Sequence, residues 1–272
     1  NLDSKILLIK LTSEFKDFNL FKTKNFTIPI IKETSLYTQN VLESILILIS
    51  DLPLMFFFLI ILYIENSSDI SVSNIQIKAN GGGVIEQYKN LTTSKITDKA
   101  IMRAGVLVNI SKNETFKNIL VNNVSVSDIF FEDPGFKRDE KEVKTAMGTQ
   151  AYGFGIRFFN SSKSGLIEGI IVADCFVENV GHTGIKMTSS GSNRFRNIKV
   201  FNNKLRRTGG PSIQFSRVED LHVYGNDVKY SGSPDDGRKW GRGSGLWTWG
   251  SSNVVIEKNS FMYANGPADS AG

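Results

Sequence analysis

Residues 197–215 read NIKVFNNKLRRTGGPSIQF, and residues 169–187 read GIIVADCFVENVGHTGIKM. Aligned position by position, the two stretches place apolar residues and glycines at the same points. The matching pairs are Ile170 with Ile198, Val172 with Val200, Val177 with Leu205, Gly181 with Gly209, and Ile185 with Ile213. Such a repeat is typical of proteins built from stacked copies of one structural unit.

Each repeat contains three short apolar segments separated by polar residues or glycine. The first occurs at residues 70–72, 119–121, 170–172, 198–200, 221–223 and 254–256. The second occurs at 75–77, 124–126, 175–177, 203–205, 226–228 and 259–261, and the third follows Gly105, Gly155, Gly184, Ser212 and Gly245. Apolar residues alternate within a segment, which indicates strands, because a helical repeat has a period of about 3.6. The sequence therefore predicts an all-β parallel β-helix with three strands in each coil.

Asparagine recurs at the start of the second strand in three coils, as Asn203, Asn226 and Asn259. Stacked side-chain amides at one corner can hydrogen-bond from coil to coil. The coil pattern and this asparagine corner resemble the right-handed β-helix of the pectin-lyase-like superfamily over residues 69–272. The resemblance implies a right-handed three-sheet solenoid that acts on polysaccharides, as polysaccharide lyases and β-helix glycoside hydrolases do. A β-propeller or sandwich would also show short strands, but without ladders in single-residue register.

Glycine use divides the chain into two parts, since all 24 glycines lie between Gly81 and Gly272. We assign residues 1–66 to a non-repeat N-terminal segment and residues 67–272 to the β-helix domain. Because the sequence starts with Asn1 and stops within a repeat, we expect a fragment truncated at its C-terminus. Further coils would then cover the apolar end of the solenoid.

An apolar stretch in the N-terminal part begins at Ile45 and ends at Ile64, with the sequence ILILISDLPLMFFFLIILYI. It is nearly long enough to cross a bilayer. Asp51 and Pro53 lie inside it and no cluster of cations flanks it directly, which weakens this interpretation. Two alternatives remain: a membrane or export segment that anchors the protein, and a hydrophobic cap on the first coil.

Composition narrows the possible partners. The formal net charge is +5, which suits an acidic partner, but no nucleic-acid-binding motif is present. Cys175 is the one cysteine, which excludes an internal disulfide and a multi-cysteine zinc site, and its strand position predicts a core residue. With only His182 and His222, a histidine-based metal centre is not expected. We expect a monomer without a nucleic-acid partner.

The third strands carry the most informative outward positions. Between two inward residues, each third strand places one residue that we expect to face solvent, and these residues are Leu107, Arg157, Lys186, Gln214 and Trp247. Neighbours in this row would lie ~4.8 Å apart. Cations bind carboxylate or sulfate groups, and an indole packs on the apolar face of a sugar. The row therefore predicts a binding track for an acidic polysaccharide, unless these are ordinary solvent-facing side chains.

Loop lengths favour a site on the same side. The loops before the third strand are short at 181–184 and 209–212, but long at 130–155 and 232–245. Two long loops that flank two short ones would form the walls of a trough. Its floor would carry the row, with His182 at the lip as a general acid or base.

The upper long loop adds carboxylates to the candidate site. Asp235 and Asp236 are adjacent, so each is expected to raise the pKa of the other and keep one as an acid. With Asp269 from the next coil they would supply the two carboxylates of a glycoside hydrolase. The alternative is ordinary turn chemistry in the sequence PDDG. The remaining candidates for substrate binding in or beside this loop are Arg238, Arg242 and Trp249.

Three functions follow from these residues. The first is β-elimination of an acidic polysaccharide: Arg157, Arg238 or a bound Ca²⁺ would neutralise the uronate carboxylate, and Lys186 or His182 would remove the neighbouring proton. The second is hydrolysis by the carboxylates of the upper loop. The third is a non-catalytic surface protein, an adhesin or carbohydrate-binding fibre. We favour the lyase, secreted or displayed at the cell surface, because the floor of the expected trough is cationic.

Overall fold

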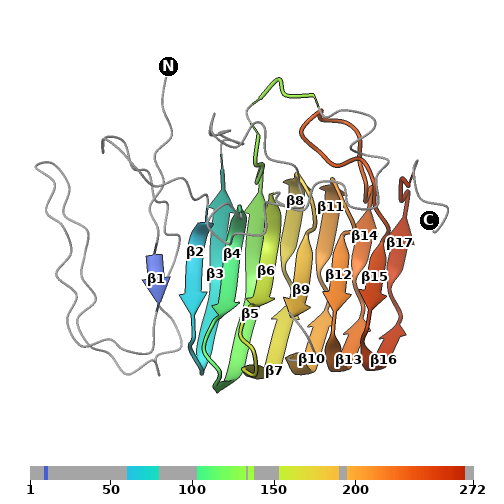
Figure 1. Cartoon of the computed structure of the whole chain (residues 1–272). Coiled ribbons are helices and arrows are strands. Elements are labelled where there is room, and N and C mark those ends of the chain that lie inside the picture. The colour runs from blue at the N-terminus through green and yellow to red at the C-terminus, as the bar shows by residue number, and fades with distance from the viewer. Residues whose placement is uncertain are drawn as a thin grey trace, which may run out of the picture.

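The computed structural model describes residues 9–11, 60–79, 103–132, 134–137, 153–189 and 195–266. All regular elements among these residues are β-strands, and the strands stack side by side from β2 to β17 (Figure 1). Every paired neighbour is parallel, and each coil contributes strands to the same faces as the coil before it. The chain is a parallel β-helix, as the repeats predict.

The third strand of each coil belongs to a seven-stranded sheet with the order β1-β2-β4-β6-β9-β12-β15. Its strands are β1 (Ile9–Leu11), β2 (Ile60–Glu65), β4 (Ala104–Ile110), β6 (Phe154–Asn160), β9 (Ile185–Ser189), β12 (Ile213–Ser216) and β15 (Leu246–Trp249). This sheet positions the candidate site.

The first and second strands of the coils form one bent ten-stranded sheet. Its strands are β3 (Ile70–Lys78), β5 (Thr115–Ser127), β7 (Leu166–Ala173), β8 (Phe176–Val180), β10 (Phe195–Phe201), β11 (Lys204–Thr208), β13 (Val218–Tyr224), β14 (Asp227–Lys229), β16 (Ser252–Glu257) and β17 (Ser260–Met262). β5 runs unbroken through the corner, so its first half pairs with β7 and its second half with β8. The three expected faces are therefore present, but two of them share one hydrogen-bonded sheet.

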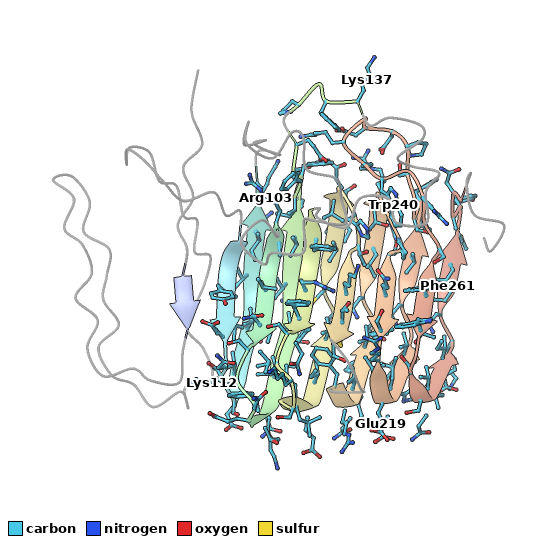
Figure 2. The ribbon with its side chains drawn as sticks, in the orientation of Figure 1. Arg103, Lys112, Lys137, Glu219, Trp240 and Phe261 are labelled. Carbon is cyan, nitrogen blue, oxygen red and sulfur yellow. The ribbon has the colours of Figure 1, made fainter. Side chains whose placement is uncertain are left out.

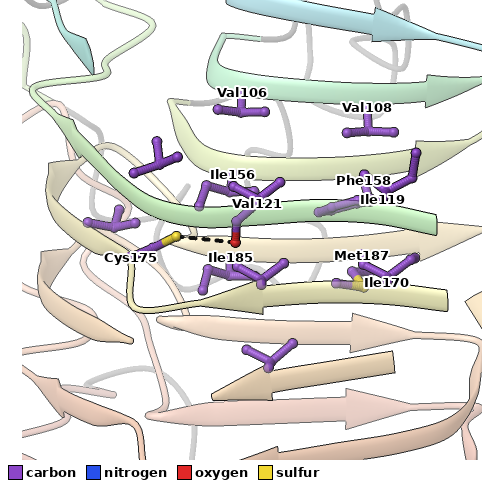
Figure 3. Close-up of a cluster of buried hydrophobic side chains, with 14 of the residues drawn as sticks. Val106, Val108, Ile119, Val121, Ile156, Phe158, Ile170, Cys175, Ile185 and Met187 are labelled. Atoms are coloured by element: carbon purple, nitrogen blue, oxygen red, sulfur yellow. Dashed lines mark hydrogen bonds between the residues drawn. The ribbon is translucent and has the colours of Figure 1, made fainter. Parts of the chain in front are cut away.

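Ladders of like residues fill the interior of the solenoid. Ile119, Ile170 and Ile198 are partners in register, and the same alignment continues to Leu221. Figure 3 shows Ile119 and Ile170 of this ladder packed in one cluster with Ile156 and Ile185 of the seven-stranded sheet. Burying each such side chain contributes roughly 1.5–3 kcal/mol. Cys175 lies among them, as expected, where burial raises the pKa of its thiol to about 11 and leaves it unreactive.

The asparagine ladder that the sequence predicts is confirmed. The Nδ2 of Asn203 donates to the Oδ1 of Asn226 at 2.9 Å, and the Nδ2 of Asn226 donates to the Oδ1 of Asn259 at 2.8 Å. Each acceptor oxygen also takes a backbone N–H, as when Asn226 N donates to Asn259 at 3.0 Å. The amides therefore fix the corner and the coil register together.

A second feature of the corners was not predicted. The residue that precedes the second strand segment of each repeat has a left-handed backbone, with φ between 51° and 66°. These residues are Asn74, Asn123, Asp174, Asn202, Gly225 and Lys258. Asn, Asp and Gly tolerate this region better than other residues. The high asparagine content of the repeats thus has a backbone cause as well as a side-chain cause.

The N-terminal boundary differs from the expected one. β2 contains the end of the apolar stretch and pairs with β4, and its Leu62 and Ile64 are buried in the core. Residues 60–65 therefore belong to the solenoid rather than to a non-repeat segment ending at residue 66. Residues 45–59 lie outside the described part, and within that part no helix is long and apolar enough to cross a membrane.

Candidate functional site

The row of third-strand side chains forms in the predicted register on the outside of the seven-stranded sheet. Arg157 is the partner of Leu107 on one side and of Lys186 on the other. Gln214 then pairs with Lys186 and with Trp247. These five residues, together with Tyr63 beside Leu107, are named the outer row. Neighbours along it are ~4.8 Å apart.

We expected every side chain of this row to face solvent. This is wrong for Leu107, Arg157 and Lys186 and right for Trp247. Leu107 is 1% exposed, and Arg157 and Lys186 are each 5% exposed, so these three do not face open solvent. Gln214 is half-buried and Trp247 is 41% exposed. The exposed fraction therefore increases along the outer row, from Leu107 to Trp247 in the last coil of the described chain.

An apolar cluster closes one end of the row. Ala104, Leu107 and Phe154 are buried together, and Tyr63 and Phe159 pack against them. These five residues are named the aromatic plug. The cluster lies outside the main core, on the other face of the same sheet. Strand alternation predicts which side a residue faces but not a second apolar layer on that side, so the sequence did not reveal it.

The guanidinium of Arg157 is held by aromatic rings and one hydroxyl. It lies 5.1 Å from the ring centroid of Phe154 and 5.3 Å from that of Phe159. Its Nη1 donates to the Oγ1 of Thr188 at 2.8 Å, while its Nε is buried without a hydrogen-bond partner among the described residues. Burial lowers the pKa of Arg157 to about 9, so it remains a cation at neutral pH.

Lys186 lies beside Arg157 without a compensating charge. Its Nζ is 5.3 Å from the centroid of the Phe154 ring, and it makes no hydrogen bond or ion pair within the part of the chain that the structure describes. Burial, and then the charge of Arg157, lowers the pKa of Lys186 well below its ordinary value. A second charge beside the buried Arg157 without an anion is unfavourable, so Lys186 favours its neutral form. A bound carboxylate or sulfate would supply the counter-charge that Arg157 lacks among the described residues.

A second row runs parallel to the outer row and was missed in the sequence. It is formed two residues further along each third strand, by Phe159, Thr188, Ser216 and Trp249. Trp249 is 52% exposed, and the guanidinium of Arg217 lies 4.8 Å from its ring centroid. The signal was the same alternation that gave the outer row, continued by one more outward position.

The two long loops meet instead of standing apart. The backbone N–H of Trp240 donates to the carbonyl of Gly181 at 3.1 Å, so the upper loop lies on a short corner. The guanidinium of Arg238 lies 3.6 Å from the ring centroid of Phe130 in the lower loop. Trp240 and Lys137 mark these loops at one edge of the solenoid in Figure 2. The trough expected between the loops at this edge is therefore filled.

His182 is enclosed by this packing. Its ring stacks on Trp240 with centroids 4.7 Å apart and an interplanar angle of 15°, and it contacts Phe154 at 5.3 Å. Its Nδ1 is 2.6 Å from the Oγ1 of Thr183. The guanidinium of Arg242 lies near the same indole, 5.7 Å from its centroid. His182 is buried, and the expected position at an open lip is wrong.

Asp236 is engaged by its own loop. It accepts hydrogen bonds from the Nε and Nη2 of Arg238 at 2.9 and 2.7 Å, and from the backbone N–H of Arg238. The side-chain hydrogen bond from Arg238 is the main reason that the pKa of Asp236 is lowered. The expectation that adjacent carboxylates raise each other's pKa is wrong here.

Asp235 is engaged in the same way. It accepts hydrogen bonds from the Nζ of Lys239 at 2.6 Å and from the hydroxyl of Ser233 at 2.7 Å, and the Nε of Arg207 is 3.6 Å away. Burial alone would raise the pKa of Asp235, but these hydrogen bonds and charges outweigh it and lower the pKa. Both aspartates hold the loop in place as carboxylates. Asp269 lies outside the described residues.

The outer row does not fit a calcium ion. Ca²⁺ takes six to eight oxygen ligands, mostly carboxylates and carbonyls. The middle of the row is cationic, and no group of three or more His, Cys, Asp or Glu that could hold a metal occurs among the described residues.

No family model matches the chain, and no curated protein matches it. Among solved structures, the chain is similar to a GH136 lacto-N-biosidase from Eubacterium ramulus, native protein, with 20% sequence identity and a TM-score of 0.46. The match covers 74% of this chain and 33% of that one, so the chain spans about a third of the length of the protein it resembles.

Proposed function

We propose that the chain is a carbohydrate-active enzyme that cleaves an acidic polysaccharide by β-elimination, with Arg157 and Lys186 at its centre. The observation that carries the proposal is this adjacent pair of buried basic side chains, a cationic arginine beside a lysine that favours its neutral form, with no carboxylate partner among the described residues. A uronate carboxylate supplies the missing negative charge. The pectin-lyase-like resemblance of the coils supports the same class of substrate.

Arg157 would bind the uronate carboxylate. Its planar guanidinium can donate two parallel hydrogen bonds to a carboxylate, and one of its nitrogens is buried without a partner in the described part. Neutralising the carboxylate makes the proton on the neighbouring C5 carbon more acidic, because the negative charge that develops in the transition state is stabilised. With a pKa of about 9, Arg157 keeps its charge under neutral conditions.

Lys186 would remove that proton. A general base must be unprotonated at the working pH, and burial together with the charge of Arg157 favours the neutral amine. The lone pair of Nζ takes the C5 proton, the C5–H electrons form the C4=C5 double bond, and the C4–O4 bond breaks. The ammonium formed on Lys186 returns its proton to the departing oxygen, so the base is regenerated.

The carboxylates of the upper loop support hydrolysis less well. Asp235 and Asp236 both have lowered pKa values and strong cationic partners, so neither is suited to donate a proton to a leaving group. His182 is buried against Trp240 and remains the second candidate for the base. Because polymeric substrates are met outside the cytoplasm, we also propose that the enzyme is secreted or displayed at the cell surface.

The test is digestion of a panel of uronate polymers and neutral glycans, followed by ultraviolet absorbance and by reducing-end assay. β-Elimination gives both signals, because the unsaturated uronate absorbs. New reducing ends without absorbance would replace the proposal with hydrolysis. Glycan binding without any product would replace it with the non-catalytic surface protein.

A further inference from the structure

A cavity of about 280 Å³ opens on the outside of the ten-stranded sheet, away from the seven-stranded sheet that carries the outer row. It lies over β5, β7 and β10, which are direct neighbours (Figure 1). Strand β3 continues the sheet on one side and β13 and β16 continue it on the other, so the cavity lies in the middle of the described solenoid. The residues that line it include Asn118, Leu120, Gly169, Ile171, Asn197 and Lys199. A cavity of this size is slightly smaller than typical sites for drug-sized ligands and suits one sugar ring.

A row of left-handed residues runs along one side of the cavity. The residue that precedes the first apolar segment of each repeat has φ between 51° and 77°, and five of the six are Asn or Asp. Where such side chains are bonded, the later coil donates to the earlier one: the Nδ2 of Asn118 donates to the Oδ1 of Asp69 at 2.7 Å, and the Nδ2 of Asn253 donates to that of Asp220. These six residues are named the left-handed row: Asp69, Asn118, Gly169, Asn197, Asp220 and Asn253.

Gly169 leaves a gap in the left-handed row. A Cβ added to it would lie 3.1 Å from the Oδ1 of Asn118, so this oxygen faces the place that a side chain would take. Within the described residues, the Oδ1 of Asn118 accepts no hydrogen bond and the amide of Asn197 makes none. The backbones of Asn118 and Asn197 are about 10 Å apart, two strand spacings. The cavity therefore has a hydrogen-bond acceptor on one side of the gap and an amide donor on the other.

The neighbouring outward side chains of the same three strands supply an apolar floor and a cation. Leu120 and Ile171 are partners in register, and Lys199 is the next partner of Ile171. Ile171 is 36% exposed, and the exposed Lys199 makes no ion pair in the part of the chain that the structure describes. Glu168, the residue before Gly169, is paired with Lys117 at 3.7 Å. The charge at the cavity therefore favours an anionic ligand.

We propose that this cavity binds one uronate residue of an acidic glycan, as a second binding site separate from the outer row. Sugar hydroxyl groups both donate and accept hydrogen bonds, so one ring can donate to the Oδ1 of Asn118 and accept from the Nδ2 of Asn197. The C–H groups of the ring pack on Leu120 and Ile171, and the ammonium of Lys199 binds the carboxylate. Such a site gives a long polymer a second point of attachment. It requires no cleavage, so it goes beyond the proposed β-elimination and does not depend on it.

The test is calorimetric titration with the trimers of galacturonate, mannuronate and guluronate, on the whole chain carrying Lys186→Met so that the proposed reaction does not consume them. Adding Gly169→Asn should raise the Kd of the bound trimer about tenfold or more. Asparagine tolerates the left-handed backbone and its amide fills the gap, so Tm should stay the same or rise. Gly225→Asn is the matched control, because Gly225 also has a left-handed φ, of 66°, but lies outside the cavity. Its Kd should equal that of the parent chain.

A second variant tests the charge without entering the core. Lys199→Gln should raise the Kd of the uronate trimer about two- to fivefold, because an exposed ion pair is weak. Maltotriose, a neutral trimer, should bind more weakly than the uronates and should not respond to this substitution. Lys204→Gln is the control, since Lys204 is equally exposed but lies on β11, outside the cavity. Equal affinity for maltotriose and for the uronates would overturn the acidic ligand.

The outer row is tested separately with Arg157→Gln in the same titrations. Binding that is lost in Gly169→Asn and kept in Arg157→Gln would support the second site, even if no glycan is cleaved. Binding that Gly169→Asn leaves unchanged and Arg157→Gln removes would overturn it and leave the outer row as the uronate site. Failure of all three trimers to bind would also overturn it, whatever the digestion assay of the proposed function gives.

Discussion

The upper loop and the outer row each bury a lysine, and the two lysines have opposite surroundings. Lys239 is 2% exposed, and its Nζ lies 2.6 Å from the carboxylate of Asp235. Lys186 is almost as buried, but its nearest charged neighbour in the row is Arg157. Burial of a cation is therefore common to a structural ion pair and to a candidate site. The candidate site differs because, within the described residues, its lysine has no oppositely charged partner.

The pKa values of the two lysines reflect this difference. Burial lowers the pKa of both. At Lys239 the hydrogen bond and charge of Asp235 raise it again and offset part of the shift. At Lys186 the charge of Arg157 lowers it further. The outer row therefore reinforces the effect of burial on its lysine, whereas the loop opposes that effect.

The largest expected effect is the loss of the base. Lys186→Met should lower kcat by about 10²–10⁴-fold, because general-base catalysis contributes that much in other enzymes. Initial rates of absorbance increase on the best uronate polymer measure it. Lys239→Met is the matched control, a buried lysine outside the row, and its kcat should stay at the wild-type value. Equal losses of kcat in both variants would show that Lys186 matters no more to the reaction than Lys239 does.

The next effect concerns substrate binding. Arg157→Gln should lower kcat/KM by about 10–100-fold, because hydrogen bonds to charged groups contribute about 1.5–3 kcal/mol. Arg206→Gln is the control, since Arg206 donates to the carbonyl of Asp227 at 2.7 Å on another face of the solenoid. If Arg157→Gln changed neither constant on any acidic glycan, the carboxylate would have to bind elsewhere.

The fold was more predictable than the site because periodicity carries most of its information. Stacking in register follows from alternation alone, and the amides of Asn203 and Asn226 could be assigned to one corner because stacked coils repeat their contacts. The unbroken course of β5 could not be predicted, because Asn123 has the same left-handed backbone as Asp174 and Asn202, where the strand is interrupted. Asparagine tolerates that conformation without requiring it.

The sequence predicted which residues of the candidate site are neighbours on adjacent strands, but not how deeply they are buried. Sequence spacing placed Arg157 next to Lys186, and the pairing confirms it. The burial of both depends on a second apolar layer that includes Phe154 and Phe159, and alternation contains no information on such layers. The pairing of Asp236 with Arg238 was likewise out of reach, because adjacent charges in a sequence do not specify which side chains meet.

The pH dependence of the rate tests whether Lys186 acts as the base. Lys186 acts only when unprotonated, so kcat/KM should rise up to tenfold per pH unit below its folded-state pKa and level off above it, until Arg157 loses its charge near pH 9. That plateau should begin well below the ordinary lysine value. A profile that keeps rising to about pH 10.4, the reference value for lysine, would show that Lys186 is not the base.

The two lysines should also have opposite effects on folding. The folded-state pKa of Lys186 is lowered, so between that value and the unfolded value the unfolded chain binds more protons, and stability rises with pH. Lys186→Met removes this penalty and should raise Tm near neutral pH, by an amount that shrinks as the pH approaches 10.4. Lys239→Met leaves Asp235 without its closest partner and should lower stability by about 1 kcal/mol. Thermal unfolding at several pH values measures both. A lower Tm for both variants would mean that Lys186 is a structural residue like Lys239.

The smallest effect on the reaction is expected from Asp236→Asn. Arg238 holds this carboxylate within the upper loop, so its removal should leave kcat at the wild-type value and lower stability by about 0.5–1 kcal/mol at neutral pH. The folded-state pKa of Asp236 is lowered, so its contribution to stability is fully present above the unfolded-state value and is lost as the pH falls through the folded-state value. The Tm difference between wild type and variant should therefore begin to shrink below about pH 4 and vanish only below the still lower folded-state value. A large loss of kcat with unchanged Tm would instead make Asp236 part of the reaction and favour hydrolysis, because a carboxylate that only holds a loop cannot affect the rate without affecting the fold.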